Sequence, residues 1–92
     1  MNDIFEPSHE PARSLYRAFQ AEAAKRNERS IEEWQNCELE AVHREAVFQA
    51  QKLGLRAPSR EEIEHAERYA RGSADYGAKW AYRIVDAMRK AA

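Results

Sequence analysis

Several residue types that restrict the class of a protein are scarce in this chain. Its 92 residues include one cysteine, three glycines and three prolines. With one cysteine the sequence contains no internal disulfide and no cysteine-based zinc site, and Cys37 is interpreted as a small buried apolar residue. Threonine is absent, and the scarcity of β-branched residues leaves little material for strands. No apolar run approaches the ~20 residues of a transmembrane helix, so no membrane association is expected.

An excess of either charge is also missing. The chain has 15 Lys and Arg against 16 Asp and Glu, a formal net charge of -1, so it has no overall field that attracts nucleic acid or anionic lipid. Residues 1–10 have no apolar stretch like that of a signal peptide, and a cytoplasmic protein is expected. The mixture of charged and aromatic residues is typical of one folded domain rather than a disordered chain.

Three breaks divide the sequence. Pro7 and Pro11 enclose the first, and residues 27–30 and 54–59 form the other two. We therefore predict a flexible tail over residues 1–10 and a single helical domain over residues 11–92. Between the breaks, Ala, Glu, Arg, Gln and Leu predominate, and these residues favour helices.

The first helix is predicted over residues 11–27, where Leu15, Tyr16 and Phe19 recur at the spacing of one helical face. A second is predicted over residues 31–53. Its start is indicated by Ser30 and Glu33, which have the spacing of a capping box, and its end by Gly54.

Residues 31–53 carry apolar side chains over a wide arc, so this helix is expected to contact two neighbours. One stripe contains Trp34, Cys37, Ala41 and Phe48, and the adjacent one Ile31, Val42, Ala46 and Leu53.

A third helix is predicted over residues 60–90, opened by a second capping box at Ser59 and Glu62. Gly72 is its weak point, because glycine costs ~1 kcal/mol relative to alanine inside a helix. A break at Gly72–Ser73, giving four helices, is the alternative, but the unbroken apolar phase favours one helix. The expected fold is all-α, an antiparallel three-helix bundle with a long C-terminal helix, which overhangs the first helix and leaves apolar surface for a partner.

Small residues form one stripe of the predicted third helix and allow another helix to approach closely. One interpretation is core packing against bulky residues of the other two helices. The other is self-association of two such helices in an antiparallel homodimer. The residues assigned to this close packing are Ala70, Ala74, Gly77 and Ala81.

An aromatic stripe, Tyr69, Tyr76 and Trp80, runs beside the small one. These rings either complete the edge of the core or form a partner-binding surface, since Tyr and Trp are enriched at interface hot spots. Arg83 is assigned to the same candidate surface.

Glu38 and Glu45 lie seven residues apart within the apolar arc of the second helix. They either meet Arg13 or Arg17 of the first helix or await a partner, so both are candidate partner-binding residues.

Charge is unevenly distributed along the chain. Residues 28–45 hold six acidic and two basic residues, and residues 68–90 hold six basic and two acidic ones. These segments either neutralise each other in an antiparallel arrangement, where each exposed pair contributes little, or the basic one contacts nucleic acid. The near-neutral chain favours the first interpretation.

No catalytic, cofactor or metal site is predicted. Glu-x-x-His, the ligand pair of di-iron bundles, occurs as Glu6/His9, Glu40/His43 and Glu62/His65. The second pair is predicted to face solvent, Glu62 belongs to a capping box and the first pair lies in the tail. No nucleophile triad or phosphate loop is present, so an enzyme is not expected.

The run Pro58-Ser59-Arg60-Glu61-Glu62-Ile63, together with residues 70–81, resembles the C-terminal part of small uncharacterised phage- and prophage-encoded proteins of proteobacteria. The similar core is Gly72-Ser73-x-Asp75-Tyr76-x-x-Lys79-Trp80-Ala81. The resemblance implies a phage accessory protein that binds and inhibits a host protein or protein complex, as anti-CRISPR proteins do.

The expected function is therefore a non-enzymatic protein-interaction module. The alternative is a small nucleic-acid-binding regulator that uses the basic face of the third helix.

Overall fold

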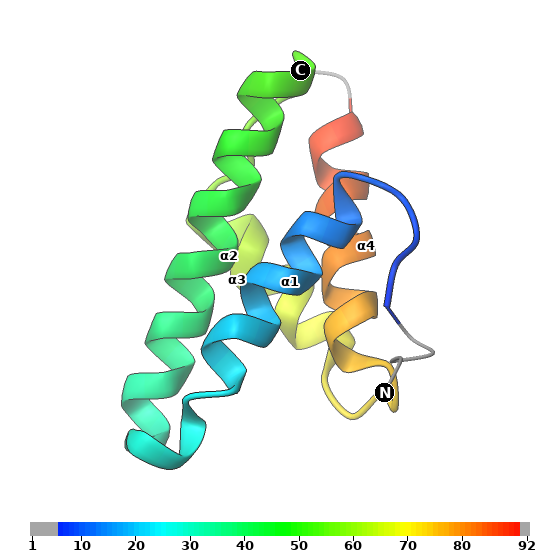
Figure 1. Ribbon diagram of the computed structural model, residues 1–92. Helices are drawn as coiled ribbons and strands as arrows, with labels where there is room; N and C mark the ends of the chain where they lie inside the picture. Colours follow the sequence, from blue (N-terminus) through cyan, green and yellow to red (C-terminus); the bar gives the residue numbers. More distant parts are fainter. Residues whose placement is uncertain (1–5, 91–92) are drawn as a thin grey trace.

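The computed structural model describes residues 6–90 and confirms an all-α fold. In chain order its elements are α1 (Ala12–Ala23), the 3-10 turn η1 (Arg26–Glu28), α2 (Ile31–Leu53), α3 (Arg60–Ala70) and α4 (Tyr76–Arg89) (Figure 1). No strand occurs among the described residues. The architecture is a four-helix arrangement, so the predicted three-helix bundle with a long C-terminal helix is wrong.

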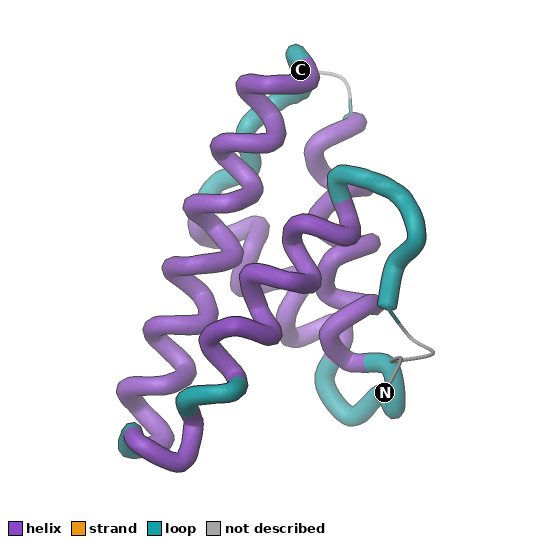
Figure 2. Tube along the Cα trace, in the orientation of Figure 1, coloured by secondary structure: helices purple, strands orange, loops and turns teal. Residues whose placement is uncertain are grey.

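The helices form two hairpins that pack on each other. α1 and α2 form the first hairpin and α3 and α4 the second, while α1 also packs on α4 and α3 on α2. In Figure 1, α1 crosses in front, between the long α2 on one side and α4 on the other. Short loops join the helices (Figure 2). The apolar core lies where the two hairpins meet.

The bounds of α2 agree with the prediction because its end signals are local. The Ser30 hydroxyl accepts from the Glu33 amide at 3.2 Å, and the Glu33 carboxylate accepts from the Ser30 amide at 2.9 Å. Gly54 ends the helix with φ 69°, a left-handed conformation that costs glycine little. Ser59 and Glu62 form a second capping box at the start of α3, as predicted.

The first helix is shorter than the predicted residues 11–27. α1 ends at Ala23, and the chain then tightens into η1 before it reverses into α2. The physical reason is a contact with α2. Arg26 turns toward α2 and donates two hydrogen bonds to Glu38. The prediction placed Arg26 in the last turn of the first helix and did not include this contact.

The predicted helix over residues 60–90 is broken between Ala70 and Tyr76. Gly72 has φ 80°, a left-handed conformation incompatible with a continuous right-handed helix. Across the break the chain folds back, and the Trp80 indole N–H donates to the Ile63 carbonyl at 3.1 Å. In a continuous helix these residues, 17 apart, would be separated by ~26 Å. The apolar positions keep the same helical spacing on both sides of Gly72 because α3 and α4 face the same core.

This break removes the expected overhang. α3 and α4 lie side by side, so their apolar faces cover each other, and α4 also packs on α1 while α3 packs on α2. The largest fully buried side chains include Trp80, Leu15, Ile63, Ile84 and Met88. The uncovered stripe that suggested a partner copy is therefore part of the core of one chain.

Three apolar residues assigned to the stripes of α2 face solvent instead. Ile31, Phe48 and Leu53 are exposed, Phe48 to 55%, whereas Val42 and Ala46 are buried as expected. Trp34 is half-buried. The helix does contact two neighbours, α1 and α3, but these cover less of its arc than the apolar pattern predicted.

Part of the expected N-terminal tail packs on the domain. Pro7 is fully buried, and Glu6 accepts a hydrogen bond from Arg17 at 3.1 Å. Residues 1–5 lie outside the described residues, so the prediction for them is untested.

Candidate functional site

The structure separates the residues that were predicted to bind a partner. Tyr69 and Arg83 lie on the outer surface of α3 and α4. Tyr76 and Trp80 belong to an inner aromatic cluster, and Glu38 of α2 lies beside it. Glu45 lies further along α2.

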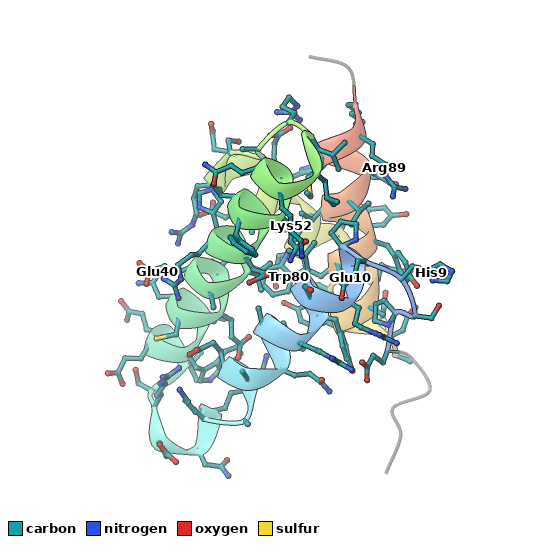
Figure 3. All side chains as sticks on the ribbon, turned by 45° about the horizontal axis from the view of Figure 1, so that its top comes forward. His9, Glu10, Glu40, Lys52, Trp80 and Arg89 are labelled. Carbon is teal, nitrogen blue, oxygen red and sulfur yellow. The ribbon has the colours of Figure 1, made fainter. Side chains whose placement is uncertain are left out.

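Trp80 has the placement of a core residue. Its side chain is 1% exposed and lies inside the bundle (Figure 3). Its ring meets Phe19 edge to face, with 5.7 Å between centroids. Because its indole N–H is already bonded to Ile63, Trp80 holds α3 and α4 together and offers a partner little surface.

Tyr76 is half-buried beside Trp80. The two ring centroids are 5.8 Å apart, and the Tyr76 hydroxyl donates to Glu67 at 2.8 Å. Burial, and then this hydrogen bond, raise the pKa of the Tyr76 phenol well above its ordinary value. The hydroxyl therefore stays protonated and remains a donor to the carboxylate.

Glu38 is paired within the chain. It is 2% exposed and accepts from Arg26 at 2.6 and 2.7 Å. The sequence suggested Arg13 or Arg17 as its partner, but those residues face Glu6 instead. Arg26 was missed because only the turn after α1 brings it to α2.

Glu45 accepts a hydrogen bond from the Gln49 amide at 2.8 Å. The two residues lie one turn apart on α2, and Gln49 is buried. This local bond satisfies the polar groups that the sequence placed within an apolar face.

A groove of about 240 Å³ lies on the outer surface of α3 and α4. Its lining contains Tyr69, 56% exposed, and Tyr82, 49% exposed. The Arg83 guanidinium carbon lies 4.3 Å from the centroid of the Tyr69 ring, and the Lys79 ammonium lies 5.8 Å from it. The cations hold Tyr69 in place while half of its surface remains open.

The charges of this groove are balanced but not paired. Lys79 and Arg83 provide two cations, and Asp75 and Asp86 provide two carboxylates. Among residues 6–90, none of these four side chains forms an ion pair within 4.0 Å. Each can therefore pair with an opposite charge supplied by a partner.

The acidic and basic segments do not neutralise each other directly. In the described part of the chain, no ion pair joins residues 28–45 to residues 68–90. Glu38 pairs with Arg26, and Arg71 with Glu67 four residues earlier. The fold-back of α4 replaces the antiparallel arrangement on which the expected neutralisation depended.

Most of the small-residue stripe is used inside the chain. A Cβ atom built at Gly77 would lie 2.7 Å from Tyr16 and 2.8 Å from Phe19, so this glycine allows α1 and α4 to approach closely. Of the stripe residues, Ala70, Gly77 and Ala81 are buried and Ala74 is exposed.

The Glu-x-x-His pairs do not converge. Figure 3 shows Glu40 and His9 pointing outward on different sides. The His43 Nε2 lies 3.2 Å from the Pro58 carbonyl, and Glu62 is bound to Arg56. In residues 6–90, no three His, Cys, Asp or Glu side chains are grouped to hold a metal ion.

Comparison with known proteins assigns no family to the chain. No protein-family model, curated protein or solved structure matches it. Within the described residues, no helix is long and apolar enough to cross a membrane. Function is therefore inferred from the side chains and their geometry.

Proposed function

We propose that this protein is a non-enzymatic protein-interaction module that binds a segment of another protein in the α3–α4 groove. The observation that carries the proposal is the exposure of Tyr69 and Tyr82 beside Arg83. Tyr and Arg are the residue types on which binding energy concentrates at interfaces. Arg83 already orders the Tyr69 ring, which lowers the entropy that this side chain loses on binding.

The charge balance of the groove favours a protein over a nucleic acid. A phosphate backbone gains affinity from each cation that it contacts, but here Asp75 and Asp86 offset Lys79 and Arg83. A polypeptide carries charges of both signs and can pair with all four. The second candidate function, nucleic-acid binding, is favoured by one feature: an exposed tyrosine beside two cations can stack on a base.

The biological context of the proposal is inhibition or modulation of a host complex by a phage-encoded protein. It is supported by the sequence resemblance over residues 58–63 and 70–81, which includes Asp75 and Lys79 of the groove. An anti-CRISPR-like inhibitor is the specific form. The expected homodimer has no assigned surface among the described residues, because Ala70, Gly77 and Ala81 pack within one chain.

A photocrosslinking experiment tests the groove. A benzophenone amino acid replaces Tyr82 in one variant and Phe48 in the matched control, which is similarly exposed but lies on α2. After irradiation in a bacterial host, the Tyr82 variant is expected to give a discrete protein adduct that the Phe48 variant lacks. Adding Tyr69→Ala should remove it. Identical adducts at both positions, or an adduct that survives Tyr69→Ala, would contradict the proposal.

Salt dependence separates the two candidate functions. A protein complex held by two tyrosines and balanced charges should lose little affinity between 50 and 200 mM salt. A nucleic-acid complex would lose affinity steeply over that range, because phosphate contacts release counterions. Fluorescence anisotropy with the crosslinked partner, and with single-stranded DNA, measures both.

A further inference from the structure

A larger hollow, of about 460 Å³, opens at the other aromatic cluster of the molecule. It lies between α2, the end of α3, the turn after it and the first turns of α4. It shares no lining residue with the α3–α4 groove. Its lining includes Trp34, Leu39, Tyr76, Trp80, Arg26 and Glu38. Its volume falls within the ~300–1,000 Å³ typical of small-ligand sites.

Aromatic rings form much of the wall. Tyr76 and Trp80 meet at an interplanar angle of 44°, and Trp34 contributes a third ring from α2. The Arg26 guanidinium carbon lies 3.9 Å from the centroid of the Trp34 ring. Because Arg26 is also bound to Glu38, the Trp34 ring is held in place before any ligand arrives.

The principal polar groups of the hollow already have partners. Both Glu38 oxygens accept from Arg26. Glu67 accepts from the Tyr76 hydroxyl and from Arg71, and the Trp80 indole N–H is bonded to Ile63. A ligand that depended on hydrogen bonds would have to displace these internal ones. The surface that remains available is mainly the faces and edges of rings.

The charges of the hollow also cancel. Arg26 and Arg71 provide two cations, Glu38 and Glu67 provide two carboxylates, and each cation is paired with one carboxylate. A charged ligand therefore gains no net attraction and must lose its own hydration on entry. An uncharged planar ring loses little hydration and gains contact with the half-buried rings of Trp34 and Tyr76, while the nearly buried Trp80 contributes little surface.

We propose that this hollow is a binding site for a neutral aromatic ring. The proposal goes beyond the function assigned to the α3–α4 groove and is independent of it, because the two sites have no residue in common. The same chemistry is carried by a free small molecule or by an aromatic side chain of a polypeptide.

Titration of the protein by NMR tests this site directly. The chain has two tryptophans, and both line the hollow, so their two indole N–H signals report on it. Indole represents the free ligand, and N-acetyl-tryptophanamide represents a ring attached to a polypeptide. Saturable shifts of both signals are expected with at least one of the two probes. Tighter binding of indole would indicate a free small molecule as the ligand, and tighter binding of N-acetyl-tryptophanamide would indicate an aromatic side chain of a polypeptide. Absence of saturable shifts with both probes would overturn the proposal.

Charged analogues test the chemical class. Indole-3-acetate carries a carboxylate and tryptamine carries an ammonium group, and both are expected to bind no more tightly than indole. If either binds about tenfold more tightly, the assignment to a neutral ring is wrong.

A matched pair of variants places the site. Trp34→Ala removes one aromatic wall and is expected to weaken probe binding by up to about tenfold. Phe48→Ala removes an exposed ring from the same helix, outside the hollow, and should leave affinity unchanged. The Trp80 indole signal shows whether each variant keeps its fold, and Trp34→Leu is the substitute if Trp34→Ala unfolds. Unchanged affinity in the folded Trp34 variant, or an equal loss in Phe48→Ala, would overturn the proposal.

Discussion

Arg26 donates two hydrogen bonds, of 2.6 and 2.7 Å, to the carboxylate of Glu38. The arginine comes from the turn after α1, and the glutamate is buried on α2, so the pair fixes the first hairpin. The same guanidinium group covers the Trp34 ring. One arginine thus orders a turn, neutralises a buried charge and holds one wall of the larger hollow.

Removal of Arg26 should destabilise the fold. Arg26→Ala leaves the Glu38 carboxylate buried without its partner, and we expect the free energy of unfolding to fall by about 2 kcal/mol. This is less than the ~3–5 kcal/mol of fully buried pairs, because the Arg26 side chain is 37% exposed. Arg26→Lys should also lower the free energy of unfolding, but by less than Arg26→Ala. The lysine keeps the positive charge, but its ammonium group cannot form the two parallel bonds. Urea unfolding measures each change.

The control for Arg26 is a pair with a more exposed arginine. The Arg71 side chain is 63% exposed and binds Glu67, four residues earlier, so Arg71→Ala should cost less than Arg26→Ala, about 0.5 kcal/mol. Equal losses in Arg26→Ala and Arg71→Ala would show that burial of Glu38 adds nothing to the strength of its pair.

The features that were predictable from sequence are those encoded within one turn of helix. Ser30 with Glu33, and Ser59 with Glu62, satisfy helix-end amides three residues away, so their spacing alone locates the two helix starts. Gly54 likewise ends α2 through its own backbone conformation.

The features that were not predictable depend on contacts between distant segments. An apolar phase that continues through Gly72 is compatible with one long helix or with two helices facing one core. The contact that distinguishes them, Trp80 to Ile63, spans 17 residues. Arg26 was missed for the same reason, and Phe48 was assigned to the core because periodicity alone does not show how much of an arc the neighbouring helices cover.

Gly77 should be intolerant of a side chain although it lies inside a helix. Alanine would add up to ~1 kcal/mol of helix propensity, but its Cβ atom would lie 2.7 Å from the Tyr16 ring. Overpacking of this kind typically costs ~1–3 kcal/mol, so Gly77→Ala should lower the thermal midpoint. Phe19→Leu relieves part of the crowding, and the double variant should lose less than the sum of the single losses. A higher midpoint for Gly77→Ala would show that α1 moves away without cost.

Within the aromatic stripe, Trp80 should contribute to stability and Tyr69 to partner binding. Trp80→Ala removes a buried ring and should lower the free energy of unfolding by ~3–5 kcal/mol. Tyr69→Ala removes an exposed ring and should change it by less than ~0.5 kcal/mol, while weakening partner capture. Chemical unfolding and the photocrosslinking yield measure the two effects. A large stability loss in Tyr69→Ala would assign that residue to the core as well.

Glu62 is held by several hydrogen bonds at the start of α3. It accepts two hydrogen bonds from Arg56 and one from the Ser59 amide. Arg56 in turn donates to the Ala87 carbonyl at the end of α4. The Arg56 guanidinium, followed by the Ser59 amide, lowers the pKa of Glu62 from 4.5 to about 2. The ionised carboxylate therefore helps to join the start of α3 to the end of α4.

Acid should weaken this junction in a defined range of pH. Because the folded state holds the pKa of Glu62 below its unfolded value, its contribution to stability is fully present above pH ~4.5 and is lost as the pH falls toward ~2. Glu62→Gln should reduce stability at neutral pH and flatten that part of the stability profile. Glu61→Gln is the matched control, since Glu61 is exposed and forms no ion pair within the described residues. Urea midpoints from pH 2 to 7 measure the difference, and parallel profiles for wild type and Glu62→Gln would show that Glu62 does not stabilise the junction as a carboxylate.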